Sequence, residues 1–446
     1  MAQDEGNDRS GRLSRRQLVL RGGAGAGGLL IAGTAAACGS SGSGGSSGAG
    51  GSAGTIKIGF VSPLTGPAAG FGEPDPYVVG LAKKAFAKGI VIGGKTWDVQ
   101  IIEKDNQATP SVSAQVANDL IHSEGVDLLL ATSTPESVNP ASDAAEAAGV
   151  PCVSTVVPWE AWYFGRGAKP GAPSPFRFTY HFCFGVQEFA DNYTHLWPQV
   201  PTNKTVGVMW PNDADGNAIR ASLGPLLKQA GYAIIDPGAY QDGTNDYSSQ
   251  IATFKKHNCE IFNTFPIPPD FATFWRQAAQ QGYTQMVKIA QIAKTGLFES
   301  QVDALGSLGK NLATGFYWGP TWPYKSSLTG ISNADLASGY EAEANKQWNQ
   351  QLGPSMALFD VANAVLKASG DPKDKVKVAN AMKTLRVDTT LGTLHWGTGP
   401  VPNVVATPIP GGQWVKGTKW PLEFHFCENS GDPNIPVAAK LVPYNS

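Results

Sequence analysis

Short apolar runs alternate with longer amphipathic segments along most of the chain. The short runs are rich in Ile, Val, Leu and Phe and stop at Pro or Gly, which indicates strands. The longer segments open with Thr or Pro and continue with helical spacing. In the first half of the chain the pattern predicts strands at 56–61, 97–103, 126–131 and 150–154, and helices at 77–88, 110–122 and 135–148. This repeated βαβ order predicts a parallel sheet with helices on both faces.

A second series of the same kind follows the Gly- and Pro-rich stretch at 165–175. It predicts strands at 206–210, 233–235 and 260–265, and helices at 217–230, 247–257 and 270–282. Three later helices, at 333–351, 355–369 and 375–385, are expected to return to the first sheet. The predicted fold class is therefore α/β, with two doubly wound parallel-sheet domains joined by a multi-strand hinge. Such an arrangement implies a central cleft, because ligands of open α/β sheets bind outside the carboxyl ends of the strands.

The expected division of the globular chain follows from these two series. The N-terminal lobe is expected to comprise residues 55–180 and 291–385, and the C-terminal lobe residues 181–290 and 386–446. Interrupted segments of this kind require several passages of the chain between the lobes.

The first 54 residues have the composition of an export signal and a tether. Residues 1–37 contain the pair Arg15-Arg16 before a Gly- and Ala-rich apolar stretch, which resembles a bacterial twin-arginine signal. Small residues precede Cys38 as in a lipoprotein processing box, although Ala35 replaces the usual Leu. Residues 38–54 continue as a Gly/Ser/Ala coil. We expect a lipid on Cys38 to hold an exported body at the outer face of the cytoplasmic membrane; the alternative is an unprocessed thiol.

Composition excludes several classes of protein. The chain has 446 residues with 34 Lys and Arg against 36 Asp and Glu, so no basic field attracts nucleic acid. No run of 18 or more apolar residues occurs, so the sequence predicts no transmembrane helix. The hydrophobic content of 42% is enough for large buried cores.

Several segments in order make the resemblance to a known family specific. They are IKIGFVSPLTGP at 56–67, EKDNQATP at 103–110, NPASD at 139–143, WPND at 210–213 and WRQA at 275–278. Together they resemble the leucine/isoleucine/valine-binding protein family. That resemblance implies a type I periplasmic-binding-protein fold and a monomer that captures a small molecule. It also implies delivery to the permease of an ABC importer, without catalysis, cofactor, metal or nucleic acid.

The resemblance implies a ligand site between the lobes, but the expected amino-acid clamp is altered on both sides. Pro135 donates no N–H, and Glu136 adds negative charge where a ligand carboxylate would bind. We therefore expect a small hydrophobic or aromatic, amino-acid-like or organic-acid ligand. The alternative for the loop residues is helix capping, and for the aromatic residues it is core or hinge packing. The candidate ligand-binding residues are Phe71, Ser133, Thr134, Glu136, Ser137, Val156, Val157, Trp159, Phe265, Ile267, Gln291 and Trp318.

Two His-x-Cys segments allow three interpretations of their cysteines. His181 precedes Cys183 as His425 precedes Cys427, and both segments are predicted to be extended. A disulfide between Cys183 and Cys427 is expected, because an exported protein meets an oxidising compartment. Free thiols and a His₂Cys₂ metal site are the alternatives.

The sequence thus predicts a lipid-anchored solute-binding protein of an ABC importer. A ligand-sensing receptor subunit of the same fold is one alternative, and an ordinary branched-chain amino-acid binder is another. A secreted hydrolase is a third, although no H-E-x-x-H motif supports it.

Overall fold

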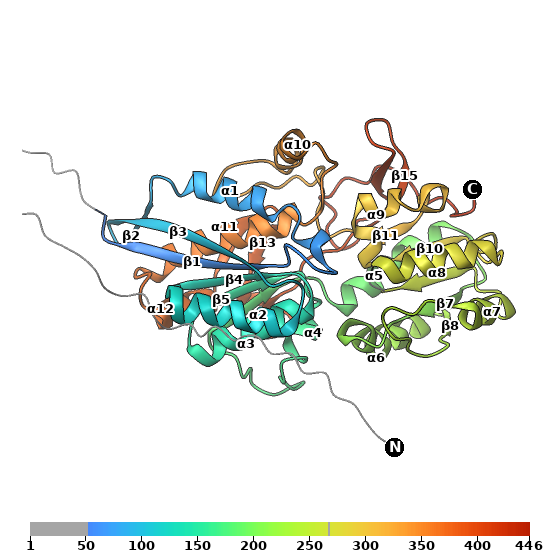
Figure 1. The fold of residues 1–446 in the computed structure, drawn as a ribbon, viewed down its shortest axis with the longest axis horizontal. Coiled ribbons are helices and arrows are strands. Elements are labelled where there is room, and N and C mark those ends of the chain that lie inside the picture. Colours follow the sequence, from blue (N-terminus) through green and yellow to red (C-terminus); the bar gives the residue numbers. More distant parts are fainter. Residues whose placement is uncertain (1–51, 266–267) are drawn as a thin grey trace, which may run out of the picture. The chain divides into compact units, whose positions relative to one another are not determined.

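The computed structural model describes residues 52–265 and 268–446 (Figure 1). The expected signal and Cys38 therefore lie outside the described residues, as does Ile267. Among the described helices, none has the length and hydropathy needed to cross a membrane.

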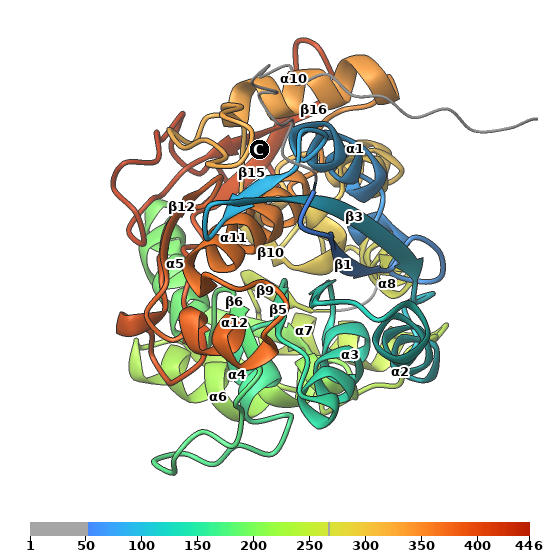
Figure 2. The same ribbon diagram turned by 90° about the vertical axis from the view of Figure 1, so that its left-hand side faces the viewer.

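The first sheet confirms the predicted parallel βαβ series. Strands β6, β5, β4, β1 and β3 run parallel, β14 pairs parallel with β6, and β2 joins the opposite edge antiparallel. Figures 1 and 2 show α2 and α3 on one face and α1 and α11 on the other. In sheet order the strands are β14 (Val404–Val405), β6 (Thr179–Phe182), β5 (Cys152–Thr155), β4 (Leu128–Thr132), β1 (Thr55–Ser62), β3 (Lys95–Asp105) and β2 (Ile90–Ile92). The helices are α1 (Asp75–Ala85), α2 (Pro110–Asn118), α3 (Pro135–Ala148), α4 (Trp159–Tyr163), α10 (Asn333–Ala344), α11 (Leu352–Ser369) and α12 (Lys375–Met382).

The second sheet repeats the arrangement with an antiparallel extension. Strands β8, β7, β9, β10 and β11 are parallel, and the hairpin of β15 and β16 extends the sheet antiparallel beyond β11. In sheet order the strands are β16 (Leu422–Phe426), β15 (Gly411–Lys416), β11 (Ala313–Gly315), β10 (Ile289–Ile292), β9 (Ile261–Thr264), β7 (Thr205–Met209) and β8 (Ala233–Ile235). The helices are α5 (Val186–Leu196), α6 (Ala214–Gln229), α7 (Ser248–Lys256), α8 (Pro268–Gln280) and α9 (Glu299–Asp303). A separate hairpin pairs β12 (Arg386–Thr389) with β13 (Gly392–His395).

The chain passes between the two sheets after β6, after β11 and after β14. Two of these passages come later than the expected boundaries at 290/291 and 385/386. Strand β10 begins at Ile289 and continues the parallel series beside β9, so it stays in the second sheet together with β11. Strand β14 pairs with β6, so the chain remains with the first sheet as far as Val405. The passages are hydrogen-bonded to one another: Cys183 N donates to Val405 O at 3.0 Å, and Phe316 N to Pro410 O at 3.0 Å.

The return to the first sheet is confirmed for α11, the middle one of the three late helices, and α10 and α12 contact α11. Helix α11 contacts β5, β4 and α1, and Phe359 on this helix lies with its ring 5.5 Å from the ring of Phe60 in β1. Helix α11 is buried around most of its circumference, which accounts for its largely apolar sequence.

One segment shows why a motif needs its structural context. Residues 89–96, GIVIGGKT, have the G-x-x-x-x-G-K-T spacing of a phosphate-binding loop. In the structure they form β2 and the turn into β3, with Gly93 and Gly94 at positive φ. A phosphate-binding loop must open a helix, whose N-terminal N–H groups hold the anion. This hairpin has no such helix and is a structural turn.

Candidate functional site

Two loops at the carboxyl ends of β4 and β5 form the first-lobe side of the candidate site. Ser133, Thr134 and Val156 have φ values of 66°, 67° and 59°, in the left-handed region that non-glycine residues rarely adopt. The loops are tied together because Ser133 N donates to Thr155 O and Thr134 N to Val156 O, both at 3.3 Å. Strained backbone of this kind concentrates at functional sites, where the surrounding structure maintains it.

The side chains of the first loop divide into two groups. Thr134 stands at the N-cap of α3, but its hydroxyl makes no capping hydrogen bond. Ser133 is buried and its Oγ lies 2.9 Å from Thr132 Oγ1. Ser137 is also buried, and its hydroxyl donates to Asn106 Oδ1 at 3.3 Å. Ser137 and Ser133 therefore shape the loop from within, while Thr134 remains partly accessible.

A charged cluster occupies the facing loops of the second lobe, and the sequence analysis missed it. Lys294 lies two residues after the end of β10, and its Nζ lies 3.1 Å from Asp213 Oδ2 and 3.0 Å from Asp215 Oδ2. Asp213 also caps α6, since its Oδ1 accepts a hydrogen bond from Gly216 N. The cluster could have been found from its place after strand ends. WPND follows β7, and Lys294 follows β10, a strand that was not predicted.

Glu136 of the first lobe is electrostatically linked to this cluster. Helices α3 and α6 are in contact, and Glu136 lies in the first turn of α3. Burial raises the pKa of Glu136, the charge of Asp215 raises it further, and Lys294 opposes both. Burial alone would lower the pKa of Lys294, but Asp215, Asp213 and Glu136 outweigh it and raise that pKa. Lys294 therefore stays an ammonium, and acidic groups from both lobes surround it.

Aromatic residues from both lobes meet beside these loops. The ring of Phe71, in the loop after β1, contacts the ring of Phe298 edge-on with centroids 4.8 Å apart. Phe298 follows Lys294 in the second lobe. Phe265, which follows β9, is packed edge-on against Phe189 at 5.1 Å. Phe71 and Phe298 thus join the two lobes through an apolar contact.

Trp159 lies against the passage of the chain that follows β6. Its backbone N–H donates to Phe184 O at 3.0 Å. A Cβ on Gly185 would lie 2.1 Å from Trp159 Nε1, so only glycine allows the indole this close. Trp159 is partly exposed and in contact with the hinge, so its position fits either ligand contact or hinge packing.

Three other candidates are core residues in the structure. Gln291 is buried within β10, and its Oε1 accepts from Trp197 Nε1 at 3.2 Å. Val157 packs in the small core around Trp162. Trp318 is buried, 5.8 Å from the ring of Trp348, in the passage that follows β11. The alternative of core or hinge packing, stated for the aromatic residues, therefore describes Trp318.

The expected disulfide is not formed, and the His-x-Cys segments make no metal site. Cys183 and Cys427 are both free and buried. Cys183 follows β6 in the first sheet, whereas Cys427 follows β16 in the second, where its N–H donates to Gly411 O. The two cysteines thus belong to different sheets. Among the residues that the structure describes, no group of His, Cys, Asp and Glu could hold a metal ion. Cys152 and Cys259 are also free, buried thiols.

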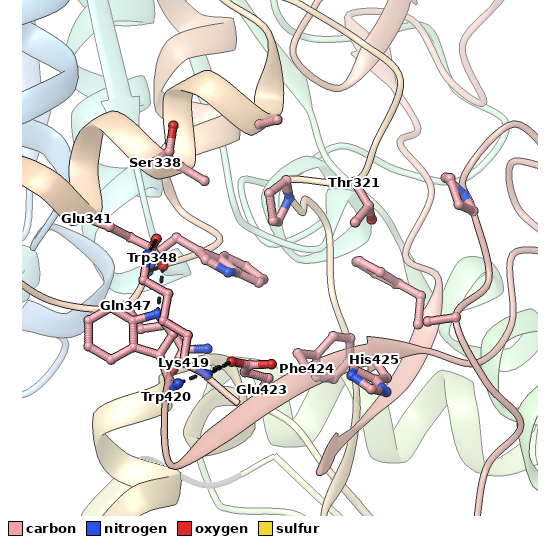
Figure 3. Close-up of a pocket in the computed structure, with 16 residues that line it drawn as sticks. Thr321, Ser338, Glu341, Gln347, Trp348, Lys419, Trp420, Glu423, Phe424 and His425 are labelled. Carbon is pink, nitrogen blue, oxygen red and sulfur yellow. Dashed lines mark hydrogen bonds and ion pairs between the residues drawn. The ribbon is translucent and has the colours of Figure 1, made fainter. Parts of the chain in front are cut away.

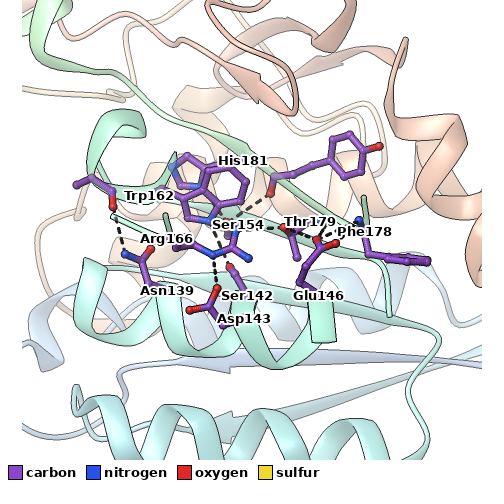
Figure 4. A network of polar contacts seen from close by, with 12 residues as sticks. Asn139, Ser142, Asp143, Glu146, Ser154, Trp162, Arg166, Phe178, Thr179 and His181 are labelled. Carbon is purple, nitrogen blue, oxygen red and sulfur yellow. Dashed lines mark hydrogen bonds and ion pairs between the residues drawn. The ribbon is translucent and has the colours of Figure 1, made fainter. Parts of the chain in front are cut away.

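His181 is a structural histidine within a polar network (Figure 4). Its Nε2 lies 2.8 Å from Val157 O, so this nitrogen carries the proton. Its Nδ1 lies 2.8 Å from Ser154 Oγ and must accept that hydroxyl proton. The imidazole is stacked on Trp162 at 4.9 Å, and burial lowers its pKa to about 3. A neutral imidazole with both nitrogens engaged has no lone pair to give to a metal.

Arg166 anchors the long loop after α4 beside this histidine (Figure 4). Its Nε lies 2.7 Å from Asp143 Oδ1, and its guanidinium lies over the rings of Trp162 and Phe176 at 4.6 and 4.2 Å. Cation–π contacts of this kind are strengthened by exclusion of water. Arg166 therefore fixes the loop structurally and takes no part in the candidate site.

Solved structures with the same fold support the arrangement of the lobes. A leucine-binding protein from Thermotoga maritima is 16% identical, with a TM-score of 0.66 over 85% of this chain and 99% of that one. A solute-binding protein of an ABC transporter from R. palustris, in complex with 4-hydroxybenzoate, is 15% identical, with a TM-score of 0.69 over 86% and 98%. A branched-chain amino acid transporter substrate-binding protein from Streptococcus pneumoniae, in complex with isoleucine, is 18% identical, with a TM-score of 0.64 over 87% and 99%.

The match to a family extends over most of the described residues. It covers residues 55–417, which include both sheets apart from β16 and the C-terminal segment. Two sheets of mostly parallel strands, linked by repeated passages of the chain, are the architecture that this match requires. The chain belongs to the periplasmic binding protein family.

Proposed function

We propose that this chain is the solute-binding subunit of an ABC importer and that its ligand binds between the two lobes. The observation that carries the proposal is the meeting of loops from the carboxyl ends of both sheets. Glu136 and Phe71 come from one lobe, and Lys294 and Phe298 from the other. Because the lobes are joined by several passages of the chain, hinge bending can open and close this contact around a ligand. The closed form would then dock on the permease.

The ligand we propose is a small hydrophobic or aromatic, amino-acid-like or organic acid. An ammonium has three N–H donors, and Lys294 uses two of them on Asp213 and Asp215. Its third donor can hold a ligand carboxylate, while Glu136 suits a donor group on the same molecule. Phe71, Phe265 and the partly exposed Trp159 offer apolar surface beside these charges. Solved structures of the same fold, in complex with 4-hydroxybenzoate and with isoleucine, support a ligand of this size and chemistry.

The test is a binding screen with matched variants. Isoleucine, leucine, 4-hydroxybenzoate and their amides are compared by thermal shift and calorimetry, because a ligand of the native state raises the melting temperature. Lys294→Met should abolish the preference for a free carboxylate over its amide. Trp159→Ala should weaken binding by about 1–3 kcal/mol if the indole touches the ligand.

Lys288→Met is the matched control for Lys294→Met. Lys288 forms an ion pair with Glu260 at the opposite end of the same strand, β10, at 3.1 Å. The Lys288→Met variant should bind the ligand as the native protein does. Equal loss of carboxylate preference in both variants would refute the role of Lys294. Submicromolar leucine binding that is unaffected by Trp159→Ala would favour an ordinary branched-chain amino-acid binder.

We also propose that Cys38 is lipidated after export through the twin-arginine route. The support is the sequence: Arg15-Arg16, the small residues before Cys38 and the Gly/Ser tether. Cys38→Ala should move the protein from the membrane fraction to the soluble exported fraction. Arg15→Lys with Arg16→Lys should retain it in the cytoplasm. Unchanged membrane association of the Cys38→Ala variant would contradict the anchor.

A further inference from the structure

Three consecutive carboxamides lie in the segment 345–351, which joins α10 to α11. They are Asn349, Gln350 and Gln351, and we call them the carboxamide triad. Asn349 is 1% exposed and the other two are fully buried, so no ligand reaches them in this structure. Buried amides are stable only when their donors and acceptors are hydrogen-bonded. The partners of the triad therefore indicate what it does.

The segment that carries the triad lies between the two lobes. Figure 3 shows Gln347 and Trp348, which precede the triad, beside Glu341 of α10 and the cavity of about 470 Å³ that α10 borders. Trp348 N donates to Glu341 Oε1 at 3.3 Å. The ring of Trp348 lies edge-on to Phe316, which follows β11 of the second lobe, with centroids 5.8 Å apart. The segment is thus held by both lobes immediately before the triad begins.

Gln350 joins the segment to the second lobe through two backbone groups. Its Oε1 accepts a hydrogen bond from Tyr317 N at 3.1 Å, in the passage after β11. Its Nε2 donates to Leu297 O at 3.3 Å, and Leu297 ends the short turn that begins at Lys294. A carboxylate could not donate to Leu297 and a hydrocarbon could bind neither group, so a carboxamide matches both partners. Gln350 therefore holds the turn that carries Lys294.

Asn349 and Gln351 hold two loops of the first lobe. Asn349 Nδ2 donates to Gly70 O at 2.8 Å, directly before Phe71. Gln351 Nε2 donates to Thr132 Oγ1 at 2.7 Å, at the carboxyl end of β4. Both loops carry candidate ligand-binding residues. Each member of the triad thus binds a different loop of the interlobe site.

We propose that the carboxamide triad positions the interlobe site, with one carboxamide fixing each of three loops around the ligand. The proposal rests on the function proposed above for that site. Gln350 positions the turn of Lys294. Asn349 positions the loop of Phe71, and Gln351 positions the loop after β4. The three loops are distant in the sequence, so a common anchor keeps their side chains in place for one ligand. Loops that are ordered in advance lose less conformational freedom on binding, so the triad should raise ligand affinity.

Amide hydrogen exchange of the free protein tests the positioning role without a ligand. Gln350→Met keeps the side-chain length but loses both hydrogen bonds, so amides in residues 293–298 should exchange about five- to tenfold faster. Those in residues 68–72 should be unchanged. Asn349→Leu keeps the shape of the native side chain and should give the opposite pattern. Mass spectrometry of peptides from the two loops provides the measurement.

Gln413→Met is the matched control. Gln413 is 2% exposed in β15, its Nε2 donates to Asn311 O at 2.9 Å, and its Oε1 accepts from Val442 N at 3.1 Å. It is thus a buried carboxamide with the same kinds of partner, outside the three loops. Its loss should lower the melting temperature but leave exchange in both loops unchanged. Faster exchange of these loops in the control would overturn the proposal, because any buried carboxamide would then have the same effect.

Ligand preference provides the readout that general destabilisation would not change. 4-Hydroxybenzoate and isoleucine are compared with their amides by calorimetry. Gln350→Met should reduce the preference for the free carboxylate about five- to tenfold, because Lys294 is displaced. Asn349→Leu should weaken acid and amide alike, because Phe71 offers only apolar contact. Equal effects of the two variants on this preference would overturn the proposal. Lack of binding to the native protein would instead contradict the proposed function, and the exchange experiment would still decide whether the triad positions the loops.

Gln350→Glu offers a rescue that depends on pH. A protonated carboxyl has the shape of the carboxamide and can donate to Leu297 O while it accepts from Tyr317 N. Burial raises the pKa of such a carboxyl above its ordinary value of about 4.3. At pH 5 the variant should therefore exchange like the native protein in residues 293–298, and at pH 8 like Gln350→Met, each rate being divided by the native rate at the same pH. A ratio that does not change with pH, or native exchange in Gln350→Met, would overturn the proposal.

Discussion

Lys294 Nζ lies 3.0 Å from Asp215 Oδ2, and this ion pair joins the end of β10 to the first turn of α6. Both side chains are nearly removed from solvent. Acidic groups outnumber the lysine, because Asp213 lies at 3.1 Å and Glu136 adds its charge from the other lobe. Lys294 is therefore the group that keeps several carboxylates together at the boundary between the lobes.

Loss of Lys294 should destabilise the protein strongly. Lys294→Met leaves Asp213 and Asp215 buried without a counter-charge, and breaking a buried pair in this way costs about 3–5 kcal/mol. The free energy of unfolding is measured by urea denaturation. The double variant Lys294→Met with Asp215→Asn should recover part of the loss. Lys288→Met removes a more exposed pair and should cost about 1 kcal/mol or less. Equal costs for the two single variants would contradict this account.

Asp75 should make stability fall as pH rises. Burial raises the pKa of Asp75 to about 8, although the hydroxyls of Ser355 and Ser62 oppose the shift. The folded protein thus retains a proton that the unfolded chain releases near pH 4. Its stabilising effect is complete below that pH and is lost as the pH rises towards 8, with a slope of at most about 1.4 kcal/mol per pH unit.

The variant Asp75→Asn tests this pH dependence, because asparagine cannot ionise but can still form hydrogen bonds with the hydroxyls of Ser62 and Ser355. The difference in unfolding free energy between Asp75→Asn and the native protein should grow in favour of the variant from pH 4 to pH 8. Asp75→Ala loses the hydrogen bonds to Ser62 and Ser355 and should be less stable throughout this range. A difference that does not depend on pH would show that Asp75 is ionised in the folded protein.

His181 should remain neutral in the folded protein across the usual pH range. Burial lowers the pKa of His181 to about 3. As the pH falls, the unfolded chain therefore binds a proton near pH 6.5, whereas the folded protein does not. Stability from this group is present above pH 6.5 and is lost as the pH falls towards 3. The ring signals of His181, assigned by comparison with His181→Gln, should not move in NMR spectra between pH 8 and pH 5. A titration with a midpoint near 6.5 would refute the buried network.

The cysteines should behave as inaccessible thiols. Burial raises the pKa of Cys427 to about 12 and also raises that of Cys183 well above its ordinary value, and the thiolate is the reactive form. A protein that begins at residue 39 should resist a thiol reagent while folded. All four of its cysteines should react after denaturation without reductant. Reaction of two thiols alone would indicate a disulfide between the other two.

Elements whose pattern is local were predictable from the residue order alone. Helix α3 spans Pro135–Ala148 and β8 spans Ala233–Ile235, as the apolar spacing predicts. The apolar run at 126–131 likewise predicts β4, since a parallel strand covered on both faces is apolar throughout, whereas β2, β6 and β14 were not predicted as strands of the same sheet. The candidate loops at Ser133, Thr134 and Val156 were found for the same reason, because each follows such a strand.

Which of the remaining side chains meet depends on how distant segments pack in the folded protein. Gln291 and Lys294 are three positions apart, yet the first faces Trp197 in the core and the second reaches Asp215 at the lobe boundary. Trp318 was predicted to face a ligand but is packed on Trp348, and Cys183 lies in a different sheet from Cys427. These outcomes depend on contacts between segments tens to hundreds of residues apart. The local spacing of apolar residues determines whether a strand forms. Which of its faces becomes buried depends on the helix or strand that packs against it.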